Sequence, residues 1–173
     1  MMKSILCALD GSRHAERALN LATEIATKFD SRLVLFHVLM RNLDAAEIRR
    51  FSEIEGLTEE SISEVQRLQN VDSRIEVGHP FDAKGIPSNT LIELGQQILA
   101  TARSNASEKG VSDIATVIGD GDPAARILSC AEQENVDCIV MGSRGLSDIQ
   151  ALLQGSVSRK VSNRADCTII TVR

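Results

Sequence analysis

Short runs of apolar residues alternate with longer segments of helical periodicity along this chain. The clearest runs are residues 5–9, 33–36 and 138–141, and weaker ones are residues 115–118 and 168–172. Continuous apolar runs of this length are typical of strands that helices cover on both faces, as in a parallel sheet. The pattern predicts an α/β fold, a doubly wound sheet of five parallel strands with helices on both faces.

Helix-start signals lie between the apolar runs. Ser12 is a candidate N-cap for a helix with one apolar face, and Pro123 suits the first turn of another. Thr90 and Glu93 have the spacing of a capping box, and Gly110 follows as a stop signal. In a sheet of this kind, ligands bind beyond the carboxyl ends of the strands. The loops after Leu9, Val38 and Met141 are therefore the first candidates for a site.

Residues 40–89 do not fit a simple crossover between two strands. They contain two short helix-like patterns and an irregular stretch with two prolines and two glycines, residues 78–88. We expect one domain, residues 1–173, in which residues 40–89 form an insertion after the second strand.

The composition excludes several classes of function. The net charge is −5 and aromatic residues make up 2%, which disfavours nucleic-acid binding through phosphate contacts or base stacking. No apolar run approaches the roughly 18 residues of a membrane span, and residues 5–9 are too short for a signal peptide. We expect a cytoplasmic protein without a nucleic-acid or membrane partner. The four cysteines form no C-x-x-C pair, so buried reduced thiols are favoured over a metal or redox site.

The stretch from Gly142 to Val157 carries the strongest candidate chemistry. It begins at the end of a predicted strand and ends where a helix begins, with glycines at 142, 145 and 155. Glycines let a backbone approach phosphate oxygens, and the first amides of a helix attract anions. The alternative is an ordinary turn followed by a Ser156 N-cap, and the residues alone leave both interpretations open.

The pattern G-x2-G-x9-G-S, from Gly142 to Ser156, resembles the ATP-binding signature of the universal stress protein family. Further resemblance lies in residues 5–12, 37–38, 121–124 and 165–173. The resemblance covers about residues 2–39 and 90–173, and it implies strand order 3-2-1-4-5 and a homodimer through the last strand, residues 167–173. The chain departs from the family in its long insertion and in Thr168, where the family often has proline.

The resemblance also implies a set of nucleotide-binding residues. Ala8 and Asp10 would line the adenosine end, and the Val38 backbone would contact the base. Met141 and Gly142 would form the floor of the site. Gly145, Gly155 and the helix start would hold the phosphates. The full set is Ala8, Asp10, Val38, Met141, Gly142, Arg144, Gly145, Gly155, Ser156 and Val157. ATP is the expected ligand, with Mg²⁺ or Mn²⁺ on its phosphates, and AMP or cyclic AMP is the alternative.

Other kinds of site fit less well. A P-loop, G-x-x-x-x-G-K-[ST], is absent, which disfavours a fast NTPase. The pattern Gly119-x-Gly121-x-x-Ala124 resembles a dinucleotide fingerprint, but Asp120 and Asp122 would face the pyrophosphate. His37 has no matched nucleophile and is interpreted as structural. The sequence contains no arranged catalytic groups, so binding is favoured over slow ATP hydrolysis or self-phosphorylation.

Overall fold

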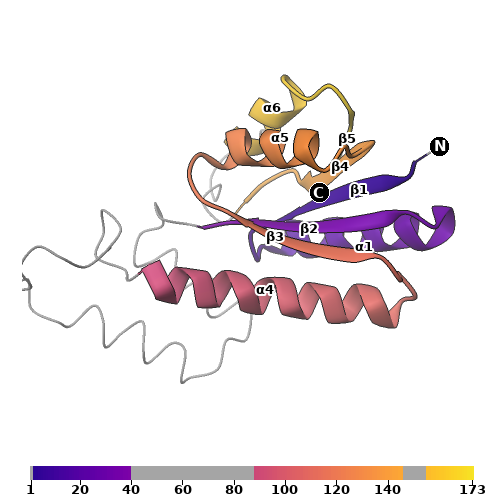
Figure 1. Cartoon of the computed structure of the whole chain (residues 1–173). Coiled ribbons are helices and arrows are strands. Elements are labelled where there is room, and N and C mark those ends of the chain that lie inside the picture. Colours follow the sequence, from indigo (N-terminus) through magenta and orange to yellow (C-terminus); the bar gives the residue numbers. More distant parts are fainter. Residues whose placement is uncertain (1, 40–87, 146–154) are drawn as a thin grey trace, which may run out of the picture.

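The computed structural model describes residues 2–39, 88–145 and 155–173. Parallel strands alternate with helices along these ranges (Figure 1). The elements in chain order are β1 (Ser4–Leu9), α1 (Arg13–Phe29), β2 (Arg32–Val38), α4 (Ser88–Glu108), β3 (Ile114–Gly119), α5 (Pro123–Gln133), β4 (Cys138–Gly142), α6 (Ser156–Ser162) and β5 (Thr168–Val172).

The sheet has five strands in the order β3-β2-β1-β4-β5, and every neighbouring pair is parallel. This confirms the predicted fold class and strand order. Helices α1 and α4 cover one face and α5 and α6 cover the other (Figure 1). The three central strands are buried along almost their whole length, whereas the edge strands β3 and β5 are partly exposed. Continuous apolar runs therefore mark the centre of the sheet, and weaker runs mark its edges.

Local signals fix most helix ends. The Ser12 hydroxyl accepts a hydrogen bond from the Ala15 amide at 3.2 Å, so the predicted N-cap of α1 is confirmed. Pro123 lies in the first turn of α5 as expected. Gly110 follows α4 with a φ of +93°, which only glycine adopts without strain.

The prediction for the start of α4 was wrong. This helix begins at Ser88, so Thr90 lies inside it and is not the N-cap of a capping box. Ser88 and the residue after it, assigned to the insertion, belong to this helix as well. The rest of the predicted insertion, residues 40–87, lies outside the described residues.

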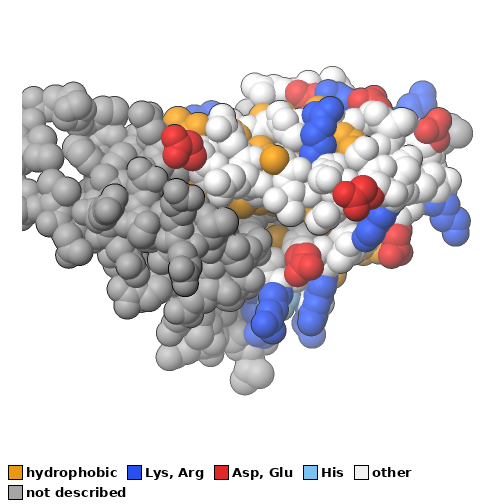
Figure 2. Space-filling view, turned by 90° about the horizontal axis from the view of Figure 1, so that it is seen from below, with side chains coloured by type: hydrophobic (Ala, Val, Ile, Leu, Met, Phe, Trp, Pro, Cys, Tyr) orange, Lys and Arg blue, Asp and Glu red, His pale blue; other side chains and the backbone are white. Residues whose placement is uncertain are grey.

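Opposite charges alternate on the surface formed by α1 and α4, where Lys and Arg side chains are interspersed with Asp and Glu (Figure 2). Cys7, Cys130 and Cys138 are buried free thiols, and Cys167 is half-buried. Burial raises the pKa of the Cys130 and Cys138 thiols to about 11, which keeps them protonated and unreactive at neutral pH. Within the described residues, no helix is long and apolar enough to cross a bilayer.

Candidate functional site

The predicted site residues gather at the carboxyl ends of β1, β2 and β4. Ala8 is paired with Met141 in the sheet register, and both belong to the apolar cluster under α5 and α6 that also contains Val38. All three side chains are almost fully buried. These residues form a continuous apolar floor at the edge of the sheet where ligands of doubly wound proteins bind.

Asp10 and Gly145 come together above this floor. One carboxylate oxygen of Asp10 accepts the Ser12 amide at 3.0 Å. The other lies against the Gly145 backbone, where a Cβ would come within 2.6 Å of it. Gly145 is not among the described residues with positive φ. Glycine suits this position because the Asp10 carboxylate comes close to the backbone, and not because the backbone has an unusual conformation.

Gly142 faces a different neighbour. A Cβ at this position would lie 2.9 Å from His14 Cβ and 3.0 Å from its carbonyl carbon, in the first turn of α1. It would also lie 3.0 Å from the Arg144 carbonyl oxygen. The bare backbone at Gly142 thus lets the start of α1 pack on the end of β4, which has a structural purpose whether or not a ligand is bound.

Ser143 anchors the loop to two other elements. Its amide donates to the Val172 carbonyl of β5 at 2.7 Å, and its carbonyl accepts the Gly155 amide at 2.8 Å. The buried Ser158 hydroxyl lies 2.9 Å from the same carbonyl and 3.0 Å from that of Gly155. Among the residues that the structure describes, the Ser143 hydroxyl is buried without a hydrogen-bond partner. These bonds hold the two ends of the glycine-rich stretch together.

The start of α6 differs from the alternative in which an ordinary turn is followed by a Ser156 N-cap. Gly155 is the N-cap and supplies no side-chain hydrogen bond, whereas Ser156 is the first helical residue and its side chain is exposed. Val157 packs on the apolar cluster beneath α6. Ser156 is therefore not an N-cap, and its hydroxyl is accessible from solvent beside Gly155.

The whole chain, residues 1–173, matches the model of the universal stress protein family. Universal stress protein YxiE of Bacillus subtilis (strain 168) is 30% identical to this chain, and the match covers 100% of both proteins. The chain belongs to the universal stress protein family. This membership confirms the resemblance on which the site residues were assigned.

Solved structures agree with this fold. The structure of hypothetical protein MJ0577 has a TM-score of 0.66 and 26% identity, covering 99% of this chain and 96% of that one. A universal stress protein in complex with cAMP has a TM-score of 0.61 and 21% identity, covering 99% and 97%. A universal stress protein from Archaeoglobus fulgidus in complex with dAMP has a TM-score of 0.58 and 18% identity, covering 100% and 98%. At these identities the last two comparisons show a shared fold.

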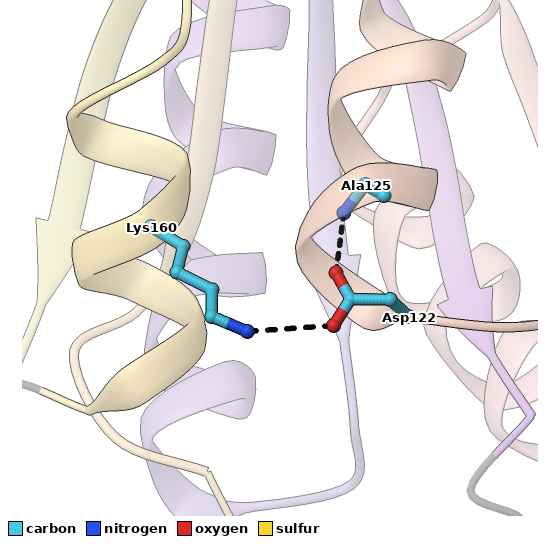
Figure 3. Close-up of polar contacts among 3 residues, drawn as sticks. All are labelled: Asp122, Ala125 and Lys160. Carbon is cyan, nitrogen blue, oxygen red and sulfur yellow. Dashed lines mark hydrogen bonds and ion pairs between the residues drawn. The ribbon is translucent and has the colours of Figure 1, made fainter.

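Residues 119–124 of this universal stress protein carry the glycine pattern that resembles a dinucleotide fingerprint. Side chains of the protein itself occupy the space around this pattern. Asp122 caps α5 through the Ala125 amide at 2.9 Å and lies 3.5 Å from Lys160 of α6 (Figure 3). The bond from Ala125 and the charge of Lys160 hold the Asp122 pKa below its usual range. Arg126 lies against Gly121 and donates from Nε to the Asp120 carbonyl at 2.6 Å. A capping carboxylate where a pyrophosphate would have to bind disfavours a dinucleotide site.

Sequence reasoning missed four residues around the site of this family member. Ser143, Ser158 and His14 form contacts within or beside the glycine-rich loop, and Gly95 of α4 packs on His37. His37 is buried, and its Nδ1 lies 2.8 Å from the Leu9 carbonyl. The spacing of Ser158 three residues after Gly155 was the only local signal for any of these contacts. The rest arise between segments that are distant in sequence.

Proposed function

We propose that this universal stress protein binds an adenine nucleotide, ATP in the first place, and acts as a cytoplasmic regulatory protein. The observation that carries the proposal is the approach of Asp10 to the bare backbone of Gly145. A carboxylate can accept hydrogen bonds from ribose hydroxyls. Glycine backbone next to it leaves room for phosphate oxygens, and the N-cap of α6, Gly155, has no side chain to accept from the first amides of that helix. The relatives solved with cAMP and dAMP support an adenine nucleotide.

The proposal divides the ligand between two parts of the site. The apolar floor of Ala8, Val38 and Met141 would accommodate the adenine base, with the Val38 backbone contacting its edge. Gly142 would extend this floor, and Arg144, Gly145, Gly155, Ser156 and Val157 would surround the phosphates.

A divalent ion fits this arrangement. Asp10 is negative and lies against Gly145, so a triphosphate beside Gly145 would be repelled unless a cation intervened. In the described residues, no group of three His, Cys, Asp or Glu could hold a metal by itself. We therefore propose that Mg²⁺ or Mn²⁺ would arrive with the phosphates and be held chiefly by them.

Two experiments test the nucleotide proposal. Mass spectrometry of small molecules released from the purified, denatured protein would identify a bound nucleotide directly. Calorimetric titration with ATP, AMP and cyclic AMP, each with and without Mg²⁺, would rank the ligands. ATP should bind most tightly and gain affinity from Mg²⁺. An empty protein that binds none of the three would overturn the proposal.

Slow ATP hydrolysis or self-phosphorylation is the second candidate. His37, the histidine considered as a base, is buried and its Nδ1 donates to the Leu9 carbonyl, so this nitrogen cannot activate a nucleophile. A steady-state phosphate-release assay with and without Mg²⁺ separates the two candidates. Binding without measurable phosphate release supports a regulator, whereas sustained turnover supports an enzyme.

A further inference from the structure

His37 joins the ends of two central strands at the candidate site. It is paired with Leu9 in the register of β1 and β2, and its ring nitrogen Nδ1 lies 2.8 Å from the Leu9 carbonyl oxygen. A carbonyl can only accept, so Nδ1 carries the proton and donates it. The side chain is 1% exposed. The ring therefore forms a fixed link from the end of β2 to the last residue of β1.

Helix α4 holds the other edge of the ring. A Cβ at Gly95 would lie 2.8 Å from His37 Cδ2 and 3.3 Å from Nε2, so the helix backbone presses on the imidazole. Gly95 is itself buried. The imidazole is thus confined between the Leu9 carbonyl and the backbone of α4, and it has one orientation in which Nδ1 reaches Leu9.

The next residue after Leu9 is Asp10, which faces the glycine-rich loop. One carboxylate oxygen accepts the Ser12 amide, and the other lies 2.6 Å from where a Cβ at Gly145 would stand. Any shift of the Leu9 carbonyl turns the peptide group that leads into Asp10 and moves this carboxylate. We propose that His37 is a positioning residue that sets the Asp10 carboxylate for the adenosine end of the ligand, an inference that rests on the proposed nucleotide site.

A role in proton transfer is disfavoured by the same contacts. Nδ1 donates to a backbone carbonyl, and Nε2 lies beside Gly95 of α4. Burial lowers the pKa of the imidazole, although the Leu9 hydrogen bond and the Asp10 charge oppose this effect. The ring therefore stays neutral at pH 7, and the one proton that it keeps is the one that Nδ1 donates to Leu9. A residue that merely fills the core would be replaced without loss by an apolar side chain of similar size.

Two substitutions separate positioning from packing. In His37→Asn the side-chain amide sits where Nδ1 was and can still donate to Leu9, although the outer part of the ring is lost. In His37→Leu the volume is largely kept and the donor is lost. If His37 acts as a positioning residue, adenosine binding by calorimetry should weaken about three- to ten-fold in His37→Leu, as one lost neutral hydrogen bond implies. It should recover most of the way in His37→Asn.

Hydrogen exchange at the Ser12 amide gives a readout that needs no nucleotide. This amide donates to Asp10, so it should exchange faster in His37→Leu than in wild type and in His37→Asn. Amides of α5, which lies on the face of the sheet opposite to α4, serve as the internal reference. Equal protection at Ser12 in all three proteins would overturn the positioning role even if all three bind nucleotide.

Gly95→Ala tests the position of the His37 ring from the side of α4. The added methyl group meets Cδ2 of His37, so it should weaken adenosine binding in the wild-type background. Combined with His37→Ala, which has no atom at the place of Cδ2 and no donor for Leu9, the same change should have little further effect. Equal losses in both backgrounds would assign the effect to α4 and overturn the inference. If wild type itself binds neither adenosine nor ATP, the proposed function fails first, and the inference fails with it.

Discussion

The Asp10 carboxylate occupies the space that a side chain at Gly145 would need, although the two residues are distant in the sequence. This proximity exists because β1 and β4 are neighbours in the sheet and both end at the same edge. The obstacle that a side chain at Gly145 would meet is the tip of a carboxylate, which can move. The obstacle at Gly142 is the backbone of α1, which cannot. The two glycines should therefore respond differently to substitution.

Gly145→Val should abolish nucleotide binding while the protein stays folded. The branched side chain would fill the space beside Asp10 that the phosphates are proposed to use, and the φ of Gly145 lies outside the positive region. Calorimetry with ATP and thermal unfolding measure the two effects. An unchanged ATP affinity in the folded variant would mean that the nucleotide binds elsewhere.

Gly142→Ala is the matched control for Gly145→Val. We expect it to lower the stability of the fold, which Gly145→Val should leave intact. The alanine methyl group would press on His14 and the Arg144 carbonyl, which overpacks the joint between α1 and β4. Overpacking of this kind costs about 1–3 kcal/mol. The midpoint of unfolding should fall clearly, and a variant as stable as wild type would show that the joint can relax.

Ser156→Ala should weaken ATP more than adenosine. The exposed hydroxyl at the first position of α6 is not an N-cap, so its removal should leave the helix intact. One hydrogen bond to a charged phosphate is worth about 1.5–3 kcal/mol. Titrations with ATP and with adenosine measure the difference, and an equal loss for both ligands would contradict a phosphate contact.

Stability should fall as the pH drops below about 6.5 because of His37. In the unfolded chain a histidine takes up a proton near that pH, whereas burial lowers the His37 pKa in the folded protein. The unfolded state therefore binds the extra proton first, and stability that is complete above pH 6.5 is lost as the pH falls toward the lowered pKa. Asp122 and Asp137 also have lowered pKa values, but they titrate in a separate, more acidic window.

Denaturant unfolding between pH 5 and pH 8 measures this dependence. His37→Asn is the control because it removes the titrating group and keeps a donor for Leu9. The slope of stability against pH should be smaller in this variant over the window below pH 6.5. An identical slope in both proteins would assign the acid sensitivity to other residues.

The sequence alone was sufficient to predict the strands of the sheet, because each strand has its own run of apolar residues. Residues 5–9 and 138–141 are continuously apolar, and this local pattern survives as buried strands β1 and β4. The strand order came from the family resemblance. The start of α4 was missed because the Thr90 and Glu93 spacing resembles a cap, whereas the helix continues upstream to Ser88. A capping pattern indicates where a helix can begin, but tertiary packing decides where it does begin.

The details of the candidate site could be predicted only in part. The glycines stood out by composition, but their purposes differ, since Gly145 faces Asp10 and Gly142 faces His14. Ser143 is linked to both β5 and Gly155 through backbone groups. Every residue has such groups, so no side-chain pattern reveals which ones will pair.

β5 is the outermost strand of the described sheet on its side, and we propose its outer edge as the dimer contact. The hydrogen bonds show which residues face that edge. Thr168 donates its amide at 3.2 Å to the carbonyl of Asp137, just before β4, and the Val172 carbonyl accepts from Ser143, just after β4. Even-numbered residues of β5 thus turn their backbone groups toward β4. Ile169 and Thr171 turn theirs toward the outer edge, since the direction alternates along a strand.

Thr171→Pro should convert a β5-paired dimer into monomers. It removes an outward-facing amide while every hydrogen bond to β4 remains, and proline is tolerated on an edge strand. Light scattering measures the mass of each variant, with Thr171→Ala as the control that keeps the amide. Ile170→Pro would instead remove a donor to β4 and lower the stability of the protomer, so loss of the dimer in that variant would be ambiguous. A dimer that persists in Thr171→Pro would mean that two copies associate through a different surface, because antiparallel pairing of two β5 edges needs the amide that this substitution deletes.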